Sequence, residues 1–368
     1  MHRGLVMNDL HFGISVGIDR YPGFPGRDLG SARRDAAAFY GWLTDPTGGG
    51  LPADNARLIT VDDGVGFRSA ADGRPTIGEV NVAMRDLNSR IREQLGTGRA
   101  DWSRTRIYLY VAGHGIGPGH GESALLMADS DVHTLNNCME LSRYAGWYLR
   151  CALVHEVIVF ADCCRELTQA PDEPIGVPFT TCQLAPSGTK VLLAYASRLG
   201  TQAWEPASAD ERDRARGYFT VALLDGLRGR APGDPRTGLI TAATLAGYVY
   251  GEVERLTSGN VPYPQRGEWP ADLVVANSIF FGPAAGAQPG PHFTATIHPP
   301  AGQRNALVLL DEDEAVHARW QPGDPVPWVV GLEEGLYEVR SDTAEATETA
   351  LAGEGLFRLR GGDRDVRL

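Results

Sequence analysis

Long apolar runs are missing from this chain of 368 residues. The first apolar stretch, Leu10 to Ile18, is interrupted by His11 and by small residues, and charged residues follow it. It is therefore unlike a signal peptide, and it is too short for a membrane helix of about 20 apolar residues. We expect a cytoplasmic protein that neither spans nor binds a membrane.

Cysteine and lysine are scarce. The five cysteines are an odd number in a long chain, which does not suggest a disulfide framework, and they include no Cys-x-x-Cys pair for a structural zinc ion. We expect no metal and no cofactor. Lys190 is the only lysine among 34 basic residues, which oppose 46 acidic ones. The net charge of −12 disfavours nucleic-acid and membrane-surface binding.

What is present indicates a folded α/β protein. Hydrophobic residues make up 43% and charged residues 22% of the chain, as in soluble globular proteins, and the length fits about two domains. Between residues 10 and 281 short apolar runs alternate with helical patterns, which predicts a mostly parallel six-stranded sheet flanked by helices. The expected strands are Leu10 to Ile18, Arg57 to Thr60, Arg106 to Val111, Glu156 to Ala161, Lys190 to Ala196 and Ser278 to Phe281. The expected helices are Ser31 to Leu43, with Ser31 as the amino-terminal cap, Ile77 to Leu95, Glu140 to Leu149, Tyr218 to Leu227 and Ala242 to Leu256.

The composition changes in a Gly- and Pro-rich segment, residues 282–291, which is typical of a linker. We therefore expect a first domain over residues 1–281 and a second over residues 292–368. In the second, short alternating runs separated by turn residues predict a small all-β sandwich. This acidic domain is expected to serve packing or the docking of an activating protein, without chemistry of its own.

Two apolar strands lead into residues that carry chemistry. One is followed by His114-Gly115, and the other by Asp162-Cys-Cys-Arg165. In an open parallel sheet, ligands sit outside the carboxyl ends of the strands, so His114 and Cys164 are expected to lie together at one edge. A histidine can activate a cysteine as a nucleophile. Taken singly, each motif has a plainer interpretation, a simple turn or an inert buried cysteine.

The two motifs together resemble a known arrangement. His114 precedes Cys164 by 50 residues, which is about the separation found in caspases. Over residues 10–281 the chain is similar to bacterial members of the caspase and metacaspase clan of cysteine peptidases. The resemblance rests on six segments in the same order, namely Gly13 to Tyr21, Leu29 to Ala36, Val111 to Gly115, Asp162 to Arg165, Ala194 to Glu205 and Gly217 to Leu224.

The resemblance implies peptide hydrolysis by a cysteine–histidine dyad. In the family's cysteine motif the third residue is the nucleophile, which favours Cys164 over Cys163. His114 would hold the thiolate and protonate the leaving amine, and the backbone N–H groups of Gly115 and Cys164 would stabilise the oxyanion. The sequence departs from the family after the nucleophile, where Arg165 and a glutamate follow. Arg165 is expected either to be a solvated loop charge or to raise the thiolate fraction of Cys164.

Substrate preference is argued from charge at positions that the resemblance aligns with the caspase pocket. Asp162 stands where caspases have glutamine, and Trp204-Glu205 stands where they have tryptophan and arginine. Ala203 belongs to the same substrate loop, and Asp129 resembles another position near the pocket. Carboxylates there would favour a basic side chain, so we expect cleavage after Arg and, more weakly, after Lys. Alternatively, Asp162 only caps a turn, Glu205 is solvated and Asp129 is a turn acid.

The expected function is therefore that of a cysteine endopeptidase whose partner is a protein or peptide with Arg or Lys before the scissile bond. Many bacterial relatives resemble effectors in signalling or defence, which a partner or signal would activate. Two loops, Ala207 to Arg216 and Arg165 to Pro186, suit self-cleavage. Two other interpretations stay open: an inactive caspase-like scaffold that acts through the acidic domain, and a different cysteine hydrolase on the same sheet.

Overall fold

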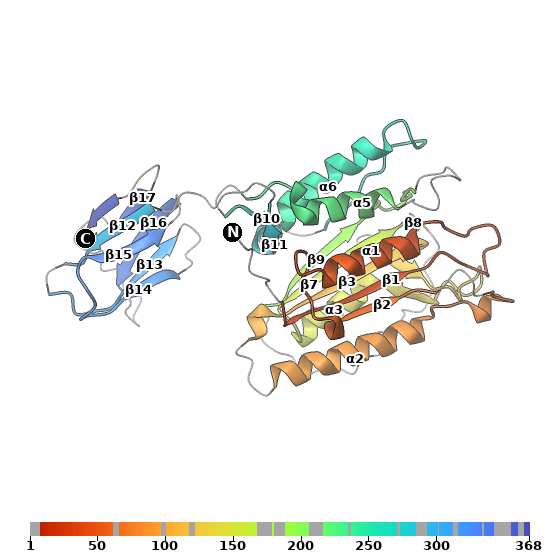
Figure 1. The fold of residues 1–368 in the computed structure, drawn as a ribbon, viewed down its shortest axis with the longest axis horizontal. Coiled ribbons are helices and arrows are strands. Elements are labelled where there is room, and N and C mark those ends of the chain that lie inside the picture. Colours follow the sequence, from red (N-terminus) through yellow and green to blue (C-terminus); the bar gives the residue numbers. More distant parts are fainter. Residues whose placement is uncertain are drawn as a thin grey trace. The chain divides into compact units, whose positions relative to one another are not determined.

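The computed structural model of the protein describes most of the chain, in two compact units (Figure 1). The described residues are 8–61, 66–96, 101–117, 122–167, 179, 188–205, 216–234, 237–270, 273–284, 293–300, 302–311, 316–332, 335–341, 355–359 and 364–368. The first unit comprises Met1–Pro232 and Leu239–Ala285, and the second comprises Gly233–Gly238 and Gly286–Leu368.

A five-stranded parallel sheet forms the centre of the first unit (Figure 1). In spatial order its strands are β2 (Ala56–Ile59), β1 (His11–Gly17), β3 (Arg106–Gly113), β7 (Glu156–Cys163) and β9 (Lys190–Tyr195). The predicted α/β fold with a central parallel sheet is thereby confirmed. The predicted sixth strand lies elsewhere: β11 (Phe280–Pro283) pairs antiparallel with β10 (Leu239–Thr241) in a separate sheet. Ser278 itself ends a short helix, α7 (Leu273–Ser278), which turns the chain before β11 begins.

Helices cover both faces of the parallel sheet (Figure 1). Helices α2 (Ile77–Leu95) and α3 (Leu141–Cys151) pack on one face. Helices α1 (Ala32–Thr44), α5 (Tyr218–Asp225) and α6 (Ala242–Thr257) pack on the other. These bounds lie within two residues of the predicted ones. Ser31 stands at the predicted capping position of α1, but its side chain makes no capping hydrogen bond.

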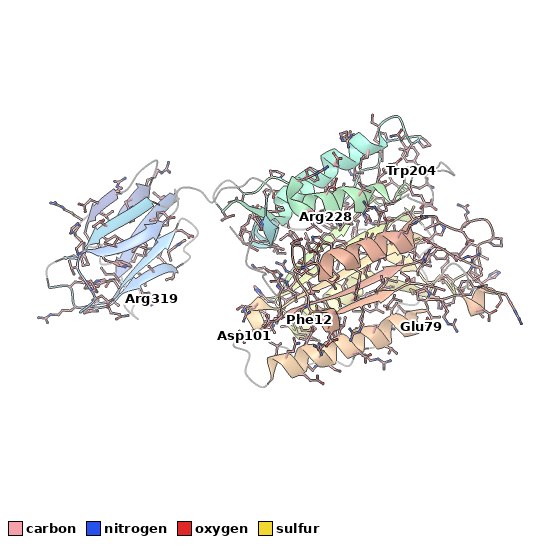
Figure 2. All side chains as sticks on the ribbon, viewed as in Figure 1. Phe12, Glu79, Asp101, Trp204, Arg228 and Arg319 are labelled. Atoms are coloured by element: carbon pink, nitrogen blue, oxygen red, sulfur yellow. The ribbon has the colours of Figure 1, made fainter. Side chains whose placement is uncertain are left out.

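Strand β1 shows how the sequence sorts side chains between the two faces. Phe12, Ile14 and Val16 are fully buried in the core beneath α2 and α3, and Figure 2 shows Phe12 among the side chains of the sheet. The residues between them are small, and the Ser15 hydroxyl donates a hydrogen bond to the Ala36 carbonyl of α1 at 2.7 Å. Because side chains alternate along a strand, α1 can lie close over the face that carries the small residues.

A second, smaller sheet extends beyond the carboxyl ends of β3 and β7. In spatial order its strands are β6 (Cys138–Glu140), β5 (Ala124–Leu126), β4 (Gly115–Gly117) and β8 (Glu166–Leu167). Strands β4 and β8 follow β3 and β7 almost directly in the chain, and they pair in parallel with each other. These strands were not predicted, because two or three residues are too few to show the alternation of apolar and polar residues that marks a strand. Their pairing holds the segments that follow His114 and Cys164 side by side.

The second unit consists of two sheets that share one apolar core. One sheet has the order β15 (Trp328–Leu332), β12 (Phe293–His298) and β18 (Arg364–Arg367). The other has the order β14 (Val316–Trp320), β13 (Leu307–Asp311), β16 (Gly335–Ser341) and β17 (Leu356–Leu359). This arrangement agrees with the predicted small all-β sandwich.

The segment expected to be a linker lies outside the described residues between 285 and 291. Its first residues, Gly282 and Pro283, belong to strand β11 instead. The predicted domain bounds therefore stay predictions.

Two further features bear on the cysteine and membrane expectations. Cys151, the last residue of α3, is disulfide-bonded, and its partner lies outside the described residues. An odd number of cysteines thus did not exclude a disulfide.

Within the described ranges, no helix is both long enough and apolar enough to cross a membrane.

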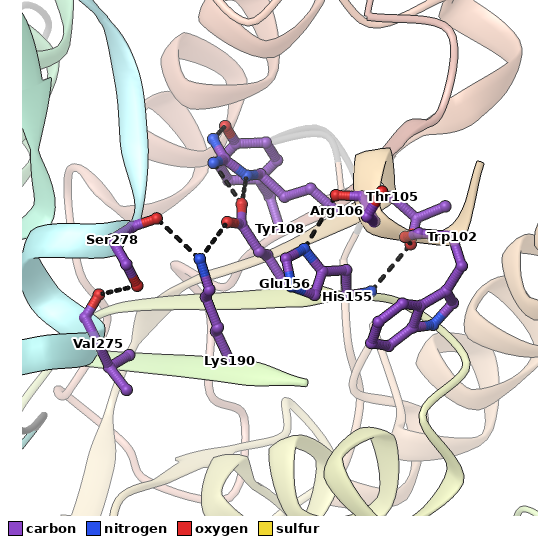
Figure 3. A network of polar contacts seen from close by, with 10 residues as sticks. Trp102, Thr105, Arg106, Tyr108, His155, Glu156, Lys190, Val275 and Ser278 are labelled. Carbon is purple, nitrogen blue, oxygen red and sulfur yellow. Dashed lines mark hydrogen bonds and ion pairs between the residues drawn. The ribbon is translucent and has the colours of Figure 1, made fainter. Parts of the chain in front are cut away.

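A polar network ties together the first residues of strands β3, β7 and β9 (Figure 3). Arg106 donates from Nε to Glu156 Oε2 at 2.7 Å and from Nη1 to the Tyr108 hydroxyl at 2.9 Å. Lys190 Nζ lies 3.8 Å from Glu156 Oε1 and donates to the Ser278 carbonyl at 3.0 Å. Arg106 and Glu156 are both largely buried. The only lysine and a buried arginine therefore share one carboxylate.

Replacing Glu156 by alanine is expected to lower the free energy of unfolding by about 3 to 5 kcal/mol, because Arg106 is left as a buried charge without an acidic partner. Lys190→Met removes the more exposed cation of the network and is expected to cost about 1 kcal/mol or less. Urea unfolding followed by far-UV circular dichroism measures both. Equal losses for the two variants would contradict this account of the network.

Candidate active site

The carboxyl ends of β3 and β7 bring His114 and Cys164 to the same edge of the sheet. The two strands are adjacent and parallel, and Gly113 is the register partner of Cys163. The residue that directly follows each strand is the predicted catalytic one, His114 after β3 and Cys164 after β7. Gly115 packs directly against the cysteine segment, since a Cβ atom at this position would lie 2.4 Å from the Cys164 carbonyl oxygen and 2.7 Å from Cys163 Sγ. Only glycine allows this close approach.

Strand alternation separates the two neighbouring cysteines. Cys163 is the last residue of β7 and points into the core beneath α2 and α3, where it is 1% exposed. Burial raises the pKa of its thiol to about 12. Cys164 follows the strand, and its side chain is only partly buried. Of the two thiols, Cys164 is therefore the one that a substrate can reach.

The Cys164 thiol lies against the segment that follows β9. The Ala203 N–H donates to Cys164 Sγ at 3.3 Å, and the thiol lies 3.7 Å from the Ala203 carbonyl oxygen. Burial raises the pKa of Cys164 to about 11, the Ala203 N–H opposes this shift, and the carboxylates of Glu166 and Asp162 add to it. Burial therefore disfavours the thiolate form of Cys164 in the free protein.

His114 is held by contacts on both its backbone and its ring. Its imidazole Nε2 bonds to the Arg27 carbonyl oxygen, and its backbone N–H donates to the Tyr21 hydroxyl at 2.8 Å. A carbonyl can only accept, so Nε2 carries the proton and Nδ1 is left with a free lone pair. Among the described residues, the His114 ring makes no hydrogen bond to the Cys164 thiol.

Arg165 is neither a solvated loop charge nor a neighbour that activates Cys164. Its side chain is fully buried and lies over the Tyr195 ring, 4.5 Å from the ring centroid. The guanidinium donates to the Glu122 carbonyl at 2.9 Å and forms an ion pair with Glu268. Arg165 therefore has a structural role instead of either role expected from the sequence, because its charge is neutralised by Glu268.

Two buried aspartates lie together beside the first turn of α5. The Thr220 N–H and hydroxyl both donate to Asp162 Oδ2, the former at 3.2 Å. The Gly217 N–H donates to Asp35 Oδ2 at 2.9 Å. A Cβ atom at Gly217 would lie 2.3 Å from Asp162 Oδ2 and 3.2 Å from Asp35 Oδ2, so the two carboxylates flank this one residue. Asp162 does cap a turn, as the alternative interpretation expected, but it is also part of an acidic pair.

The described groups around this acidic pair compensate its charge only in part. Asp35 Oδ1 is buried without a hydrogen-bond partner, and neither aspartate forms an ion pair with a described basic residue. Burial raises the pKa of Asp162 to about 6, and the nearby Glu205 carboxylate contributes. Burial and the charge of Asp162 raise the pKa of Asp35 well above its usual value, with Arg216 acting in the opposite direction. Two buried carboxyls this close together retain a proton more readily than isolated ones, and a cation placed beside them would favour their ionised form.

The predicted substrate loop lies next to these acids. Glu205 is half-buried rather than solvated, and its carboxylate accepts from the Gly30 N–H at 3.0 Å. The Trp204 N–H donates to Gln265 Oε1 at 2.8 Å, and the Trp204 ring packs edge-on against Tyr263. Figure 2 shows Trp204 near one end of α5, at the end of the unit where Figure 1 labels β8. Cys164 thus contacts Ala203, and Trp204 and Glu205 follow Ala203 directly in the chain.

Asp129 lies elsewhere. Among the described residues, its side chain contacts the Asn137 amide, and Arg74 and Glu79 are the charges that affect its pKa. Burial raises that pKa, and Asp129 Oδ1 has no hydrogen-bond partner in the part of the chain that the structure describes. The structure therefore brings Asp129 together with the region around α2 and not with Asp162 or Glu205.

The loops predicted to be cleaved fall largely outside the described residues. This applies to residues 207–215 of the first loop and to residues 168–178 and 180–186 of the second. Self-cleavage stays a prediction. In the described ranges, no group of three or more His, Cys, Asp or Glu side chains is placed to hold a metal ion.

Asp35 lies in the Leu29 to Ala36 segment of the resemblance but was not among the predicted site residues. A signal for it was present. Asp35 lies one turn before Phe39 and next to Ala36, on the apolar face of the predicted helix. An acid on a face that must be buried is costly unless it has a partner or a function, so its position was informative in itself.

Comparisons with known proteins add a likeness in structure. No protein-family model matches the sequence, and no curated protein matches it. Among solved structures, the chain is similar to the crystal structure of caspase-1 from Spodoptera frugiperda, with 13% sequence identity and a TM-score of 0.42. The match covers 78% of this chain and 98% of the caspase chain.

Proposed function

We propose that this chain is a cysteine endopeptidase that cleaves peptide bonds after arginine and, more weakly, after lysine. Cys164 is the nucleophile, His114 the general base and acid, and the backbone N–H groups of Gly115 and Cys164 form the oxyanion site. The observation that carries the proposal is the position of the buried Asp35–Asp162 pair beside an accessible thiol and a histidine.

The described groups supply the chemistry of peptide hydrolysis. Cys164 Sγ attacks the scissile carbonyl carbon while the thiol proton moves to His114 Nδ1, and the oxyanion forms. The carbon–nitrogen bond then breaks, and His114 returns the proton to the leaving amine nitrogen. Water attacks the resulting thioester and gives a proton to His114. Breaking the carbon–sulfur bond restores the protonated thiol and releases the new carboxylic acid.

The hydrogen bond at His114 Nε2 supports this order of proton transfers. Because the Arg27 carbonyl accepts from Nε2, the other ring nitrogen keeps a lone pair for the thiol proton. Since burial raises the pKa of Cys164 to about 11, proton transfer accompanies the attack and does not precede it.

Charge supports the choice of substrate. A substrate arginine or lysine would place a cation beside Asp35 and Asp162, and an acidic side chain there would face these two buried acids. Arginine is favoured over lysine because its planar guanidinium can bond two carboxylate oxygens at once.

The resting arrangement also supports control by a partner or signal. A protonated thiol and a histidine without a mutual hydrogen bond form a latent site, which small movements of the His114 and Cys164 segments would complete. Docking of an activating protein on the second unit, and a signalling or defence context, belong to this proposal as its regulatory part.

A positional peptide library tests the proposed activity. The wild-type chain is expected to cleave after arginine, with lysine about tenfold or more weaker because it loses the bidentate bond. Cleavage after aspartate would overturn the proposed specificity. If no peptide is cleaved while an electrophilic arginine probe still labels Cys164, the chain is a different cysteine hydrolase. If neither occurs, the inactive scaffold is favoured.

A further inference from the structure

Tyr21 links the segment after β1 to the catalytic histidine. The residue is 1% exposed, and its hydroxyl accepts from the His114 N–H at 2.8 Å and donates to the Leu126 carbonyl at 3.2 Å. Because β1 and β3 are adjacent and parallel, the chain leaving β1 reaches the same sheet edge as His114. The hydroxyl therefore sits between two backbone segments of the active-site edge.

The Tyr21 hydroxyl replaces one backbone hydrogen bond that would otherwise continue the pairing of β4 and β5. Strands β4 and β5 are antiparallel with Gly115 opposite Leu125, so the next pair along the register is His114 and Leu126. The Leu126 N–H donates to the His114 carbonyl at 2.8 Å, which is one of the two bonds expected for such a pair. The reciprocal bond runs through the Tyr21 hydroxyl instead. This insertion fixes the backbone of His114 while keeping it outside the regular ladder.

The Tyr21 ring also contacts the imidazole. The ring centroids of Tyr21 and His114 are 4.7 Å apart, and the ring planes are tilted by 54°. Gly113 makes room for this contact: its φ is +154°, and a Cβ atom there would lie 2.5 Å from the Tyr21 hydroxyl oxygen. One side chain thus holds both the main chain and the ring of His114.

The hydroxyl is suited to this double role because it stays protonated. Burial raises the pKa of Tyr21 well above its usual value, the His114 N–H opposes the shift, and nearby Cys163, Asp19 and Cys164 add to it. A protonated hydroxyl can accept from one backbone group and donate to another at the same time.

The geometry points to Tyr21 as a positioning residue for His114, which sets the imidazole at the distance and angle from Cys164 that proton transfer requires. This inference rests on the proposed function and adds to it a residue that touches neither substrate nor thiol in the reaction. A displacement of a catalytic group by about 1 Å can cost about 100-fold in rate.

The test compares Tyr21→Phe with Tyr148→Phe. Tyr148 is a matched control, because it is also fully buried and its hydroxyl donates to Asn88 at 2.6 Å, between α3 and α2. Tyr21→Phe is expected to lower kcat by about 10- to 100-fold with KM within about twofold, since the acid pocket is untouched. Tyr148→Phe is expected to leave both constants within about twofold while losing similar stability.

A second readout does not depend on turnover. With histidine labelled for NMR, the ring signals of His114 are expected to move in Tyr21→Phe and to stay in place in Tyr148→Phe. If the wild type cleaves no peptide, the proposed function fails, and the NMR comparison still decides the role of Tyr21. Unmoved His114 signals, equal kcat losses in the two variants, or a Tyr21→Phe chain that alone fails to fold would overturn the inference.

Discussion

Replacing Cys164 by alanine is expected to abolish peptide hydrolysis, with kcat falling by about 10⁴-fold or more. The thiol is the only described nucleophile at the carboxyl edge of β7 that is not sealed in the core, and Ala203 and Gly115 pack around it. Alanine removes the sulfur that would form the thioester, and no other group in the proposed mechanism can act as the nucleophile. Continuous hydrolysis of the best library peptide measures the loss.

Cys163→Ala is the matched control for this prediction. The two cysteines are adjacent, and burial raises the pKa of Cys163 to about 12, so its thiol is the less reactive of the two. We expect Cys163→Ala to keep kcat within about tenfold of wild type, because it removes only a buried sulfur. If Cys163→Ala is inactive and Cys164→Ala is active, the assignment of the nucleophile is wrong.

Neutralising either buried aspartate is expected to lower kcat/KM for arginine substrates by about 30-fold or more. Truncating one side of a buried charge pair costs about 2 kcal/mol or more, and Asp35 and Asp162 flank the same Gly217 backbone. Asparagine is the suitable replacement, since its amide oxygen can still accept the N–H groups of Thr220 and Gly217. The ratio of arginine to neutral substrates should fall in both variants.

The pKa of Asp162 adds a dependence on pH. With a pKa of about 6 in the free protein, Asp162 is protonated below this pH and offers no charge to an arginine. As pH rises through about 6 the carboxylate ionises, so kcat/KM for arginine substrates should rise there. A bound cation favours the ionised form, so the rise in kcat at saturating substrate should lie at lower pH. Asp162→Asn should remove this part of the profile.

Asp54→Asn serves as the control for both measurements. Asp54 is an exposed acid in the turn before β2, at the opposite edge of the sheet, and its loss should leave the arginine preference and the pH profile unchanged. If Asp54→Asn and Asp162→Asn lower kcat/KM equally, net charge and not a local pocket sets the preference. An unchanged arginine preference in both Asp35→Asn and Asp162→Asn would refute the acidic pocket.

The main elements of the first unit could be predicted because their patterns are long. The alternation in β1 and the helical periods of α1 and α2 extend over enough residues to define a strand or a helix. The prediction that a sixth strand joins the parallel sheet was wrong. A four-residue run such as Phe280–Pro283 specifies extended backbone but not its partner, which here is β10.

The site was predicted unevenly. His114 and Cys164 follow strands whose direction could be predicted, so their common edge followed from topology. Asp129 follows a three-residue strand of the small sheet, and its surroundings depend on contacts with α2 and the 129–137 turn. Arg165 was expected to be exposed or activating, and its burial became visible only with Glu268, which is distant in sequence.

The sequence by itself determined the main features along the chain. These are an α/β unit, a histidine and a cysteine at strand ends, an excess of acidic residues and an all-β unit. Local periodicity and composition are enough for these, because each depends on neighbouring residues. The tertiary structure alone decided that Asp35 lies beside Asp162, that the Tyr21 hydroxyl bridges His114 and Leu126, and that burial raises the pKa of the Cys164 thiol. These properties arise from burial and from contacts between segments far apart in the chain, and no local pattern encodes them.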